Sequence, residues 1–546
     1  MKSKYIFFAV SLFAALSANA QETYENAKLA GEDLNGTARY VGMGGAMEAL
    51  GADISTIGTN PAGIGLFRHS NVSISGGLLM QSDGKDFSNG KKTNLSFDQI
   101  GGVYSTRTGQ KSFINFGFNY HKGKNFDYIL NAANSLDGSS QNKQSYIKGM
   151  LANENSGGFF VGKGKKGQNV GYVEAPSPNN PSPNVAYTWS QIDYLYWNNL
   201  IPDKNTGRFN YESATGYNLA RANTGYIGNY DFAVSGNFND RVYLGLTFGM
   251  KDVNYKGYSE YRENFNNAGG VLVRDERKIT GSGFDITAGV IVRPVAESPF
   301  RIGAYVKTPT WYDLTTSNNT RLVYSPSTTS VLSTDSSISN SYDFKMWTPW
   351  KFGFSLGHTV GNYLALGATY EYENFSNINS RVNDGGYYDY YYGQYYESSS
   401  PDKTMNNHTK EVLKGVSTLK LGVEYKPVSN VALRIGYNYV SPKYVSDAQK
   451  DPGLASLGTA YASTTDYTNW GAINRFTLGI GYQLKKFNID LAYQYSAQNG
   501  SFAPFSNIRD VSIPSGATTV KESNIASNTD VKNNRSQLLF TLGYRF

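Results

Sequence analysis

The chain ends in RSQLLFTLGYRF (Arg535 to Phe546), and this stretch decides the fold. Apolar side chains occupy every second position from Leu538 to Phe546. The residues between them are mostly polar or small, with Leu539 as the one exception. A period of two residues places the apolar side chains on one face of a β-strand. A soluble sandwich strand shows the same pattern, but many copies in a secreted chain favour the closing strand of an outer-membrane β-barrel.

Thirteen further segments repeat this alternation after residue 70. In the most regular of them, charged residues such as Arg434, Arg475 and Asp490 occupy the face opposite the apolar one. A polar face with no helical pattern nearby to cover it is typical of a water-facing lumen, with lipid outside. The sequence therefore predicts fourteen strands, at residues 70–81, 95–106, 112–122, 228–238, 241–256, 276–293, 299–312, 342–359, 362–375, 415–427, 430–441, 473–485, 486–498 and 535–546.

The connections between these segments alternate strictly between long and short. The largest, at about residues 123–227, lies between the third and fourth strands, whereas two residues suffice at 239–240 and at 485–486. Tight periplasmic turns and extended outer loops produce this alternation in a membrane barrel. The predicted fold class is therefore all-β: a 14-stranded antiparallel transmembrane β-barrel. The long loops include DGGYYDYYYGQYY (Asp384 to Tyr396), which fits a ligand platform, an outer-leaflet aromatic girdle or simple loop packing.

The N-terminus reads as a secretory signal peptide over residues 1–20. Lys2 and Lys4 precede an apolar core, and Ala18-Asn19-Ala20 is a cleavage site before Gln21. No later run approaches the roughly 18 apolar residues of a membrane helix. Residues 21–69 lack strand alternation and begin on the periplasmic side, so we expect them to fold back into the lumen as a hatch. Residues 70–546 form the barrel. A net charge of +7 at pH 7 is too mild to demand a nucleic-acid partner.

The stretch ARYVGMGGAMEALGADISTIGTNPAGIGLFRHSNVSISGG (Ala38 to Gly77) resembles the FadL/TodX-type outer-membrane transporters of long-chain fatty acids and other hydrophobic compounds. Small Gly and Ala residues precede an Asn-Pro-Ala motif, here Asn60, Pro61 and Ala62, and a first strand follows. The resemblance continues in hairpins such as 283–309 and 422–440. It implies a 14-strand barrel closed by a hatch, in the outer membrane of a Gram-negative-type bacterium.

The resemblance also implies a function: passive uptake of hydrophobic compounds, fatty acids among them, by capture at the outer loops and lateral exit beside a kinked third strand. Here that strand is Ser112 to Lys122, and we expect Asn115, Gly117 and Asn119 to permit the kink because glycine weakens a strand interior. An ordinary strand with an ordinary glycine fits the same residues. The large polar loop at 123–227 departs from the family and leaves the specificity open.

Six charged residues are predicted to face the lumen, where mutual pairing and hatch anchoring would compensate their burial: Lys420, Glu424, Arg434, Arg475, Asp490 and Arg545. A second interpretation has Lys420 or Arg434 meeting a substrate carboxylate. The four histidines, at 69, 121, 358 and 408, are not spaced as a metal pair, so we expect no metal or cofactor and no enzyme.

Two alternative functions remain open at this point. They are a FadL-like scaffold barrel of a protein-secretion system, for which large polar Tyr-rich loops are suitable, and a haemin receptor. The expected partners are hydrophobic small molecules, outer-membrane lipid and the barrel-insertion machinery, which the terminal Phe546 suits. The chain is expected to be a monomer.

Overall fold

The computed structural model describes residues 22–154, 159–163, 169–173, 190–200, 210–266, 268–325, 334–451, 454, 456, 461–515 and 518–546. The predicted signal peptide at residues 1–20 lies outside this range. Within it, no helix combines the length and the apolar character that crossing a membrane requires.

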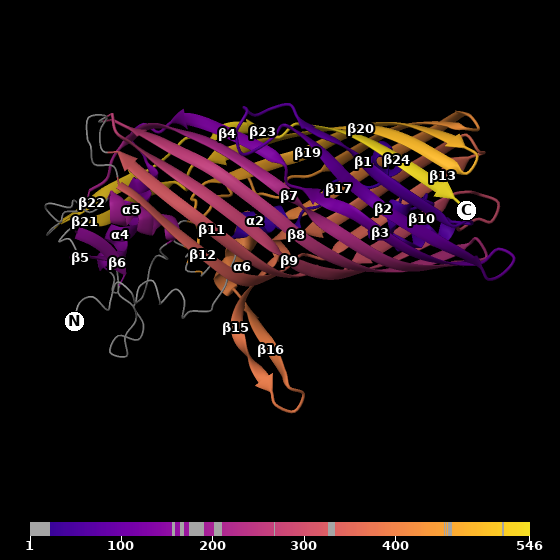
Figure 1. The fold of residues 1–546 in the computed structure, drawn as a ribbon, viewed down its shortest axis with the longest axis horizontal. Helices are drawn as coiled ribbons and strands as arrows, with labels where there is room; N and C mark the ends of the chain where they lie inside the picture. The colour runs from indigo at the N-terminus through magenta and orange to yellow at the C-terminus, as the bar shows by residue number, and fades with distance from the viewer. Residues whose placement is uncertain are drawn as a thin grey trace.

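Fourteen antiparallel strands close into one barrel, which confirms the predicted number and class (Figure 1). Each strand pairs with the next, and β24 (Arg535–Arg545) pairs with β1 (Asn71–Gln81) along the whole of β1. The strands between them are, in order, β2 (Thr93–Arg107), β3 (Phe113–Asn125), β7 (Ala214–Phe238), β8 (Val242–Phe265), β9 (Gly270–Val292), β10 (Arg301–Lys307), β13 (Lys351–Val360), β14 (Leu364–Asn374), β17 (Gly415–Val428), β18 (Val431–Val440), β19 (Tyr467–Leu484) and β20 (Phe487–Ala503).

The outside of this wall is apolar and its inside is mainly polar. On β24, Leu538, Phe540 and Leu542 are 36%, 47% and 39% exposed, whereas Thr541 faces inward and is 4% exposed. Leu539, the exception to the sequence pattern, is fully buried because it packs against the hatch helix α3 (Ala38–Gly42). The apolar outer surface and polar interior are those of a membrane-spanning barrel.

Two predicted strands, at 299–312 and 342–359, are each divided in the structure by a proline-containing tripeptide. Residues 308–310 separate β10 from β11 (Trp311–Ser325), and residues 348–350 separate β12 (Thr334–Trp347) from β13. Pro309 and Pro349 have no N–H to donate to a ladder, which explains both breaks. Polar contacts bridge the gap between the two tripeptides, since the Thr348 amide donates to the Thr310 carbonyl at 3.1 Å.

The predicted long loop at 123–227 is also partly wrong. It contains β4 (Tyr128–Ser135), which pairs with β7, and β7 begins at Ala214, fourteen residues before the predicted strand. The far end of the barrel carries most of the remaining elements of this loop and of the last long loop: α4 (Gln141–Glu154), β5 (Phe159–Lys163), β6 (Asn169–Val173), α5 (Gln191–Asn199), β21 (Ile508–Ser515) and β22 (Thr518–Asn524) (Figure 1). The last of them, β23 (Thr529–Lys532), pairs with β20 along the wall. An apolar cluster that includes Tyr196, Trp197, Phe502 and Phe505 packs α5 against β4, β7 and β20, so that α5 caps this end of the barrel.

After β14, the chain forms η3 (Phe375–Asn377), then a hairpin of β15 (Asn379–Asp389) and β16 (Gln394–Pro401), then α6 (Lys403–Val412). The hairpin projects away from the barrel wall (Figure 1).

The residues before β1 lie inside the barrel and form the hatch. It consists of α2 (Thr23–Ala30), α3, η1 (Ile54–Gly58) and η2 (Pro61–Leu66). η1 and η2 contact β2, β3, β7, β8 and β9, and α3 contacts β18, β19, β20 and β24. The hatch therefore bridges opposite sides of the wall.

Candidate functional site

The Asn-Pro-Ala motif forms the start of η2 and is fully enclosed by the wall. The Asn60 side chain accepts a hydrogen bond from the Ala62 amide at 3.2 Å and donates to the Val290 carbonyl of β9 at 3.4 Å. Gly245 and Gly289 allow this close approach, since a Cβ on either would overlap the motif itself. The motif is therefore a seat of the hatch against strands β8 and β9.

The third-strand residues also contact the hatch. The side-chain amide of Asn115 donates to the Ile64 carbonyl at 2.7 Å, and Gly117 leaves room for Ile57. Asn119 accepts from Gln99 at 3.0 Å. β3 pairs with β2 and β7 without a register shift from 113 to 121, and the shift toward β7 lies at Lys122/Lys124. The described ladder is thus regular at Asn115–Asn119, and a lateral exit there stays a prediction.

The first group of predicted lumen charges forms buried ion pairs with the hatch. Lys420 Nζ lies 2.9 Å from Glu48 Oε1 of the hatch and 2.6 Å from Glu371 Oε1 of β14. Tyr40 and Thr369 also donate to Glu48. Because each buried charge has a partner, this group fastens the hatch to the wall.

A second group links the remaining predicted charges. Arg434 contacts Glu424 at 2.7 Å and Asp490 at 2.5 Å, and Arg39 of the hatch reaches Glu424 at 3.0 Å. Arg475 donates to Asn438 at 2.8 Å and lies 3.8 Å from hatch Asp33. The structure therefore brings five of the six predicted charges together inside the lumen.

Arg545 does not join them, and its lumen position stays a prediction. It is an exposed residue of β24, paired with Asn71 at the open end of the barrel.

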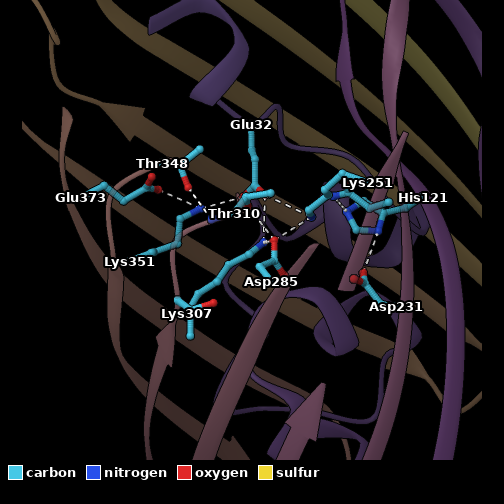
Figure 2. Close-up of polar contacts among 12 residues, drawn as sticks. Glu32, His121, Asp231, Lys251, Asp285, Lys307, Thr310, Thr348, Lys351 and Glu373 are labelled. Atoms are coloured by element: carbon cyan, nitrogen blue, oxygen red, sulfur yellow. Dashed lines mark hydrogen bonds and ion pairs between the residues drawn. The ribbon is translucent and has the colours of Figure 1, made fainter. Parts of the chain in front are cut away.

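Sequence reasoning missed a third charged group, centred on Glu32 in the hatch segment between α2 and α3. Its carboxylate lies 2.6 Å from Lys351, 3.0 Å from Lys307 and 3.8 Å from Lys251, with Asp285 close by (Figure 2). Lys251 is 3% exposed, and its ammonium has no hydrogen-bond partner in the described part of the chain. Glu32 lies in a segment without periodicity, so the pattern gave no sign of it.

Electrostatics keep Glu32 ionised. Burial opposes its charge, but the ammonium groups of Lys307, Lys351 and Lys251 outweigh burial and hold the pKa of this carboxyl well below its usual range. The ion pairs are consequently present at neutral pH and are lost only when the pH falls well below the usual carboxyl pKa.

Two small cavities flank the hatch segment at residues 31–35. The first, about 20 Å³, is lined by Gly31, Glu32, Lys307 and Pro349 among others. The second, about 30 Å³, is lined by Asp33, Arg475 and Arg535 among others. Each has room for one or two water molecules. Both are lined by charged groups, so the lumen around this segment is packed and polar.

Next to this polar level lies an apolar layer that surrounds helix α2. Leu29 of α2 is 2% exposed, and Ile279, Leu314, Phe344 and Met346 of the wall are at most 1% exposed. The layer further includes Ala27, Ala30, Phe126, Ile227, Val253, Tyr255, Tyr312, Tyr342, Phe375, Ile378, Val412, Leu413, Val416, Tyr444, Ala448 and Tyr461. An apolar compartment rich in aromatic rings therefore lies directly beside the charged hatch segment at residues 31–35.

Cations crowd the C-terminal end of α2. Lys443 donates to the Ala27 carbonyl at 2.9 Å and Lys124 to the Gly31 carbonyl at 3.1 Å, where the helix dipole favours positive charge. Lys28 lies 3.8 Å from the centre of the Tyr255 ring. Burial lowers the pKa of Lys28 to about 7, with Arg221, Lys124 and Arg277 adding to the effect and Glu25 opposing it.

This lowered pKa predicts that α2 is held less firmly at pH 7 than at pH 9. Released into water, Lys28 would regain a pKa near 10.4. Between pH 7 and pH 10 the released form therefore binds more protons than the form with α2 in place, so the seated position of α2 becomes more stable as the pH rises. One such group changes the seating equilibrium at most about tenfold per pH unit. Hydrogen–deuterium exchange of residues 22–31, corrected for intrinsic rates, measures it. Lys28→Met should weaken the dependence and leave the part that comes from Lys443, whose pKa burial also lowers to about 7. Lys410→Met, at an exposed lysine of α6, should leave the dependence unchanged. Equal protection at both pH values would contradict the prediction.

The histidines do not converge. His121 lies 3.4 Å from Asp231, and His408 contacts Thr23 of α2 at 3.0 Å. No cluster of three or more His, Cys, Asp or Glu side chains suited to a metal ion occurs among the residues that the structure describes.

Comparison with known proteins finds similarity only among solved structures. No family model and no curated protein matches the chain. The solved toluene transporter TbuX of Ralstonia pickettii is 12% identical, with a TM-score of 0.44 over 94% of this chain and 99% of that chain. The toluene transporter TodX of P. putida is 11% identical, with a TM-score of 0.44 over 94% and 99%. A FadL homologue of Pseudomonas aeruginosa is 11% identical, with a TM-score of 0.46 over 95% and 100%.

Proposed function

We propose that the protein is a passive outer-membrane channel for hydrophobic compounds. The observation that carries this proposal is the apolar layer around α2, a greasy and aromatic compartment enclosed within a barrel whose lumen is otherwise polar. If the layer served only as a structural core, it would not need a separate helix with cations at its end to fill it. We interpret α2 as occupying the compartment that cargo takes when the helix moves.

The charged hatch level bears on the route. An apolar compound gains nothing by entering a layer of ion pairs, since it would displace them without replacing their contacts. Cargo would therefore leave sideways through the wall. The third strand at Asn115–Asn119 is one proposed exit. The proline tripeptides at 308–310 and 348–350 are another, since Thr308, Thr310, Thr348 and Pro349 line the cavity beside Glu32.

Fatty acids are the cargo that we propose within this class. Their tail suits the apolar layer, and their carboxylate matches the group that Lys251, Lys307 and Lys351 already hold in Glu32. Residues Leu29, Ile227 and Tyr312 line the cavity and belong to the apolar layer as well, so head and tail sites adjoin. Glu32 would then compete with the cargo head group.

The test compares binding of palmitate and toluene to the purified protein and to Glu32→Gln. Removing the competing charge should tighten palmitate about tenfold, roughly 1.4 kcal/mol, and leave toluene unchanged. Glu276→Gln, at an exposed carboxylate of β9, is the matched control. If only toluene binds, and its affinity is the same in Glu32→Gln, the fatty-acid proposal is contradicted but the channel proposal stands.

The secretion scaffold is the second candidate, and the packed interior favours it. Both cavities beside the hatch are of water size, and the far end of the barrel is capped. If neither palmitate nor toluene binds, and mass spectrometry of the purified barrel finds a stoichiometric protein partner in place of lipid, the channel proposal fails and the scaffold stands.

A further inference from the structure

The exposed apolar side chains on the outer surface of the barrel end in an aromatic edge close to the base of the β15–β16 hairpin. On β14 the outward side chains Leu366, Tyr370 and Tyr372 are 39%, 47% and 40% exposed, and Trp350 nearby is 49% exposed. Aromatic residues at such an edge mark the level of the lipid headgroups. The hairpin begins at Asn379, seven residues after Tyr372, so its base lies near this level.

The base of the hairpin is fixed to the wall. β15 pairs with β12 from Lys345↔Arg381 to Trp347↔Asn379. The Arg381 guanidinium lies 4.2 Å from the centre of the Trp347 ring, and its Nε donates to Ser399 at 3.0 Å. From this base the hairpin runs crosswise to the barrel axis, away from the wall (Figure 1). The eight residues of β15 beyond this base, 382–389, reach roughly 26 Å at about 3.3 Å per residue. The hairpin thus extends over the surrounding bilayer surface.

The outer part of the hairpin presents tyrosine and almost no charge. Tyr390, Tyr391 and Tyr392 at the turn are 90%, 88% and 67% exposed, and Tyr387, Tyr388 and Tyr395 are 64%, 49% and 57% exposed. Residues 385–398 contain two charged side chains. Asp389 accepts hydrogen bonds from the backbone amides of Tyr391 and Tyr392 and so closes the turn, and Glu397 is paired with Gly386 toward the base.

We infer that this hairpin is a lateral membrane anchor, which lies on the outer leaflet and sets its tyrosines among the lipid headgroups. A tyrosine ring is apolar along its body and polar at its tip, which suits the headgroup level. The hairpin is continuous with the aromatic edge of the membrane-facing wall, and its projection keeps it at that level. The anchor does not depend on the cargo of the channel.

The test uses a single fluorescent label, since the chain contains no cysteine. Gln394→Cys, which keeps every tyrosine, is labelled with bimane in the full-length protein reconstituted into phospholipid vesicles. Val520→Cys, on the β21–β22 hairpin at the far end of the barrel, is the matched exposed control. Headgroup-attached nitroxide lipid should quench the label at 394 about fivefold more than the label at 520, and aqueous iodide should quench it less.

A second variant connects the effect to the tyrosines. Replacing Tyr390, Tyr391 and Tyr392 with Ser should abolish the difference between the labels at 394 and 520, with insertion checked by heat-modifiable gel migration. Equal quenching of the two labels in the parent protein would overturn the anchor, as would unchanged lipid quenching in the triple variant.

Discussion

Gly245→Ala is expected to unseat the hatch and turn a closed barrel into one that conducts ions. A Cβ at this position of β8 would overlap the Pro61 carbonyl carbon and the Ala62 nitrogen and lie 2.6 Å from Pro61 O. These are backbone atoms of η2, which cannot swing aside like the end of a flexible side chain. Overpacking of this kind costs about 1–3 kcal/mol, enough to raise the ratio of unseated to seated hatch roughly 5- to 150-fold.

Single-channel recording in planar bilayers checks this result. Gly543→Ala is the matched control, since Gly543 also faces inward, on β24, but a Cβ there meets nothing closer than 3.6 Å. Heat-modifiable gel migration confirms that both variants insert. If Gly245→Ala conducts no more than Gly543→Ala, the seat formed by Asn60, Pro61 and Ala62 is not what keeps the barrel closed.

Lys420→Met is expected to destabilise the folded barrel by about 3–5 kcal/mol. The substitution removes the cation shared by Glu48, which is fully buried, and Glu371, which is 6% exposed. Breaking a buried ion pair from one side leaves uncompensated charge in a low-dielectric site, and this penalty exceeds the value of the pair itself. The midpoint of urea unfolding, followed by the loss of the fast-migrating folded band, measures the change.

A second substitution separates charge from packing. Glu48→Gln in the Lys420→Met background removes one of the stranded charges and should recover part of the loss. Lys426→Met, at the periplasmic end of the same strand, should leave the midpoint nearly unchanged. A double variant no more stable than Lys420→Met would indicate that the lysine contributes through packing rather than through its charge.

The wall was predictable where one face of a strand meets lipid and the other meets the lumen. That contrast exists only within the bilayer, which is why fourteen strands emerged from a period of two residues. Beyond the bilayer the contrast fades, so β4 and the first half of β7 left no alternating signal and were assigned to a loop. The breaks at Pro309 and Pro349 were missed because the alternation continues on both sides of them.

The alternation along the strands also predicted which charged side chains face the lumen. Residue parity on β17, β18, β19 and β20 placed Lys420, Arg434, Arg475 and Asp490 in the lumen, because a strand alternates strictly. Arg545 has the same parity on β24, but it lies at the open end of the strand and is exposed. Nothing comparable locates Glu32, because its lysine partners come from three different strands and meet only after the barrel closes. Such a site is set by tertiary structure, not by local pattern.

The contact between the first and last parts of the chain also constrains the order of assembly. The Ala38 amide donates to Thr541 of β24 at 2.7 Å, and Leu539 packs on α3. Synthesis makes the hatch first and β24 last, so the hatch is available before the ring closes. We expect the unfinished sheet to curl around its own N-terminus. The final strand thus joins a seam whose inner surface is already in place, and the plug acts as the template on which the cylinder is sealed.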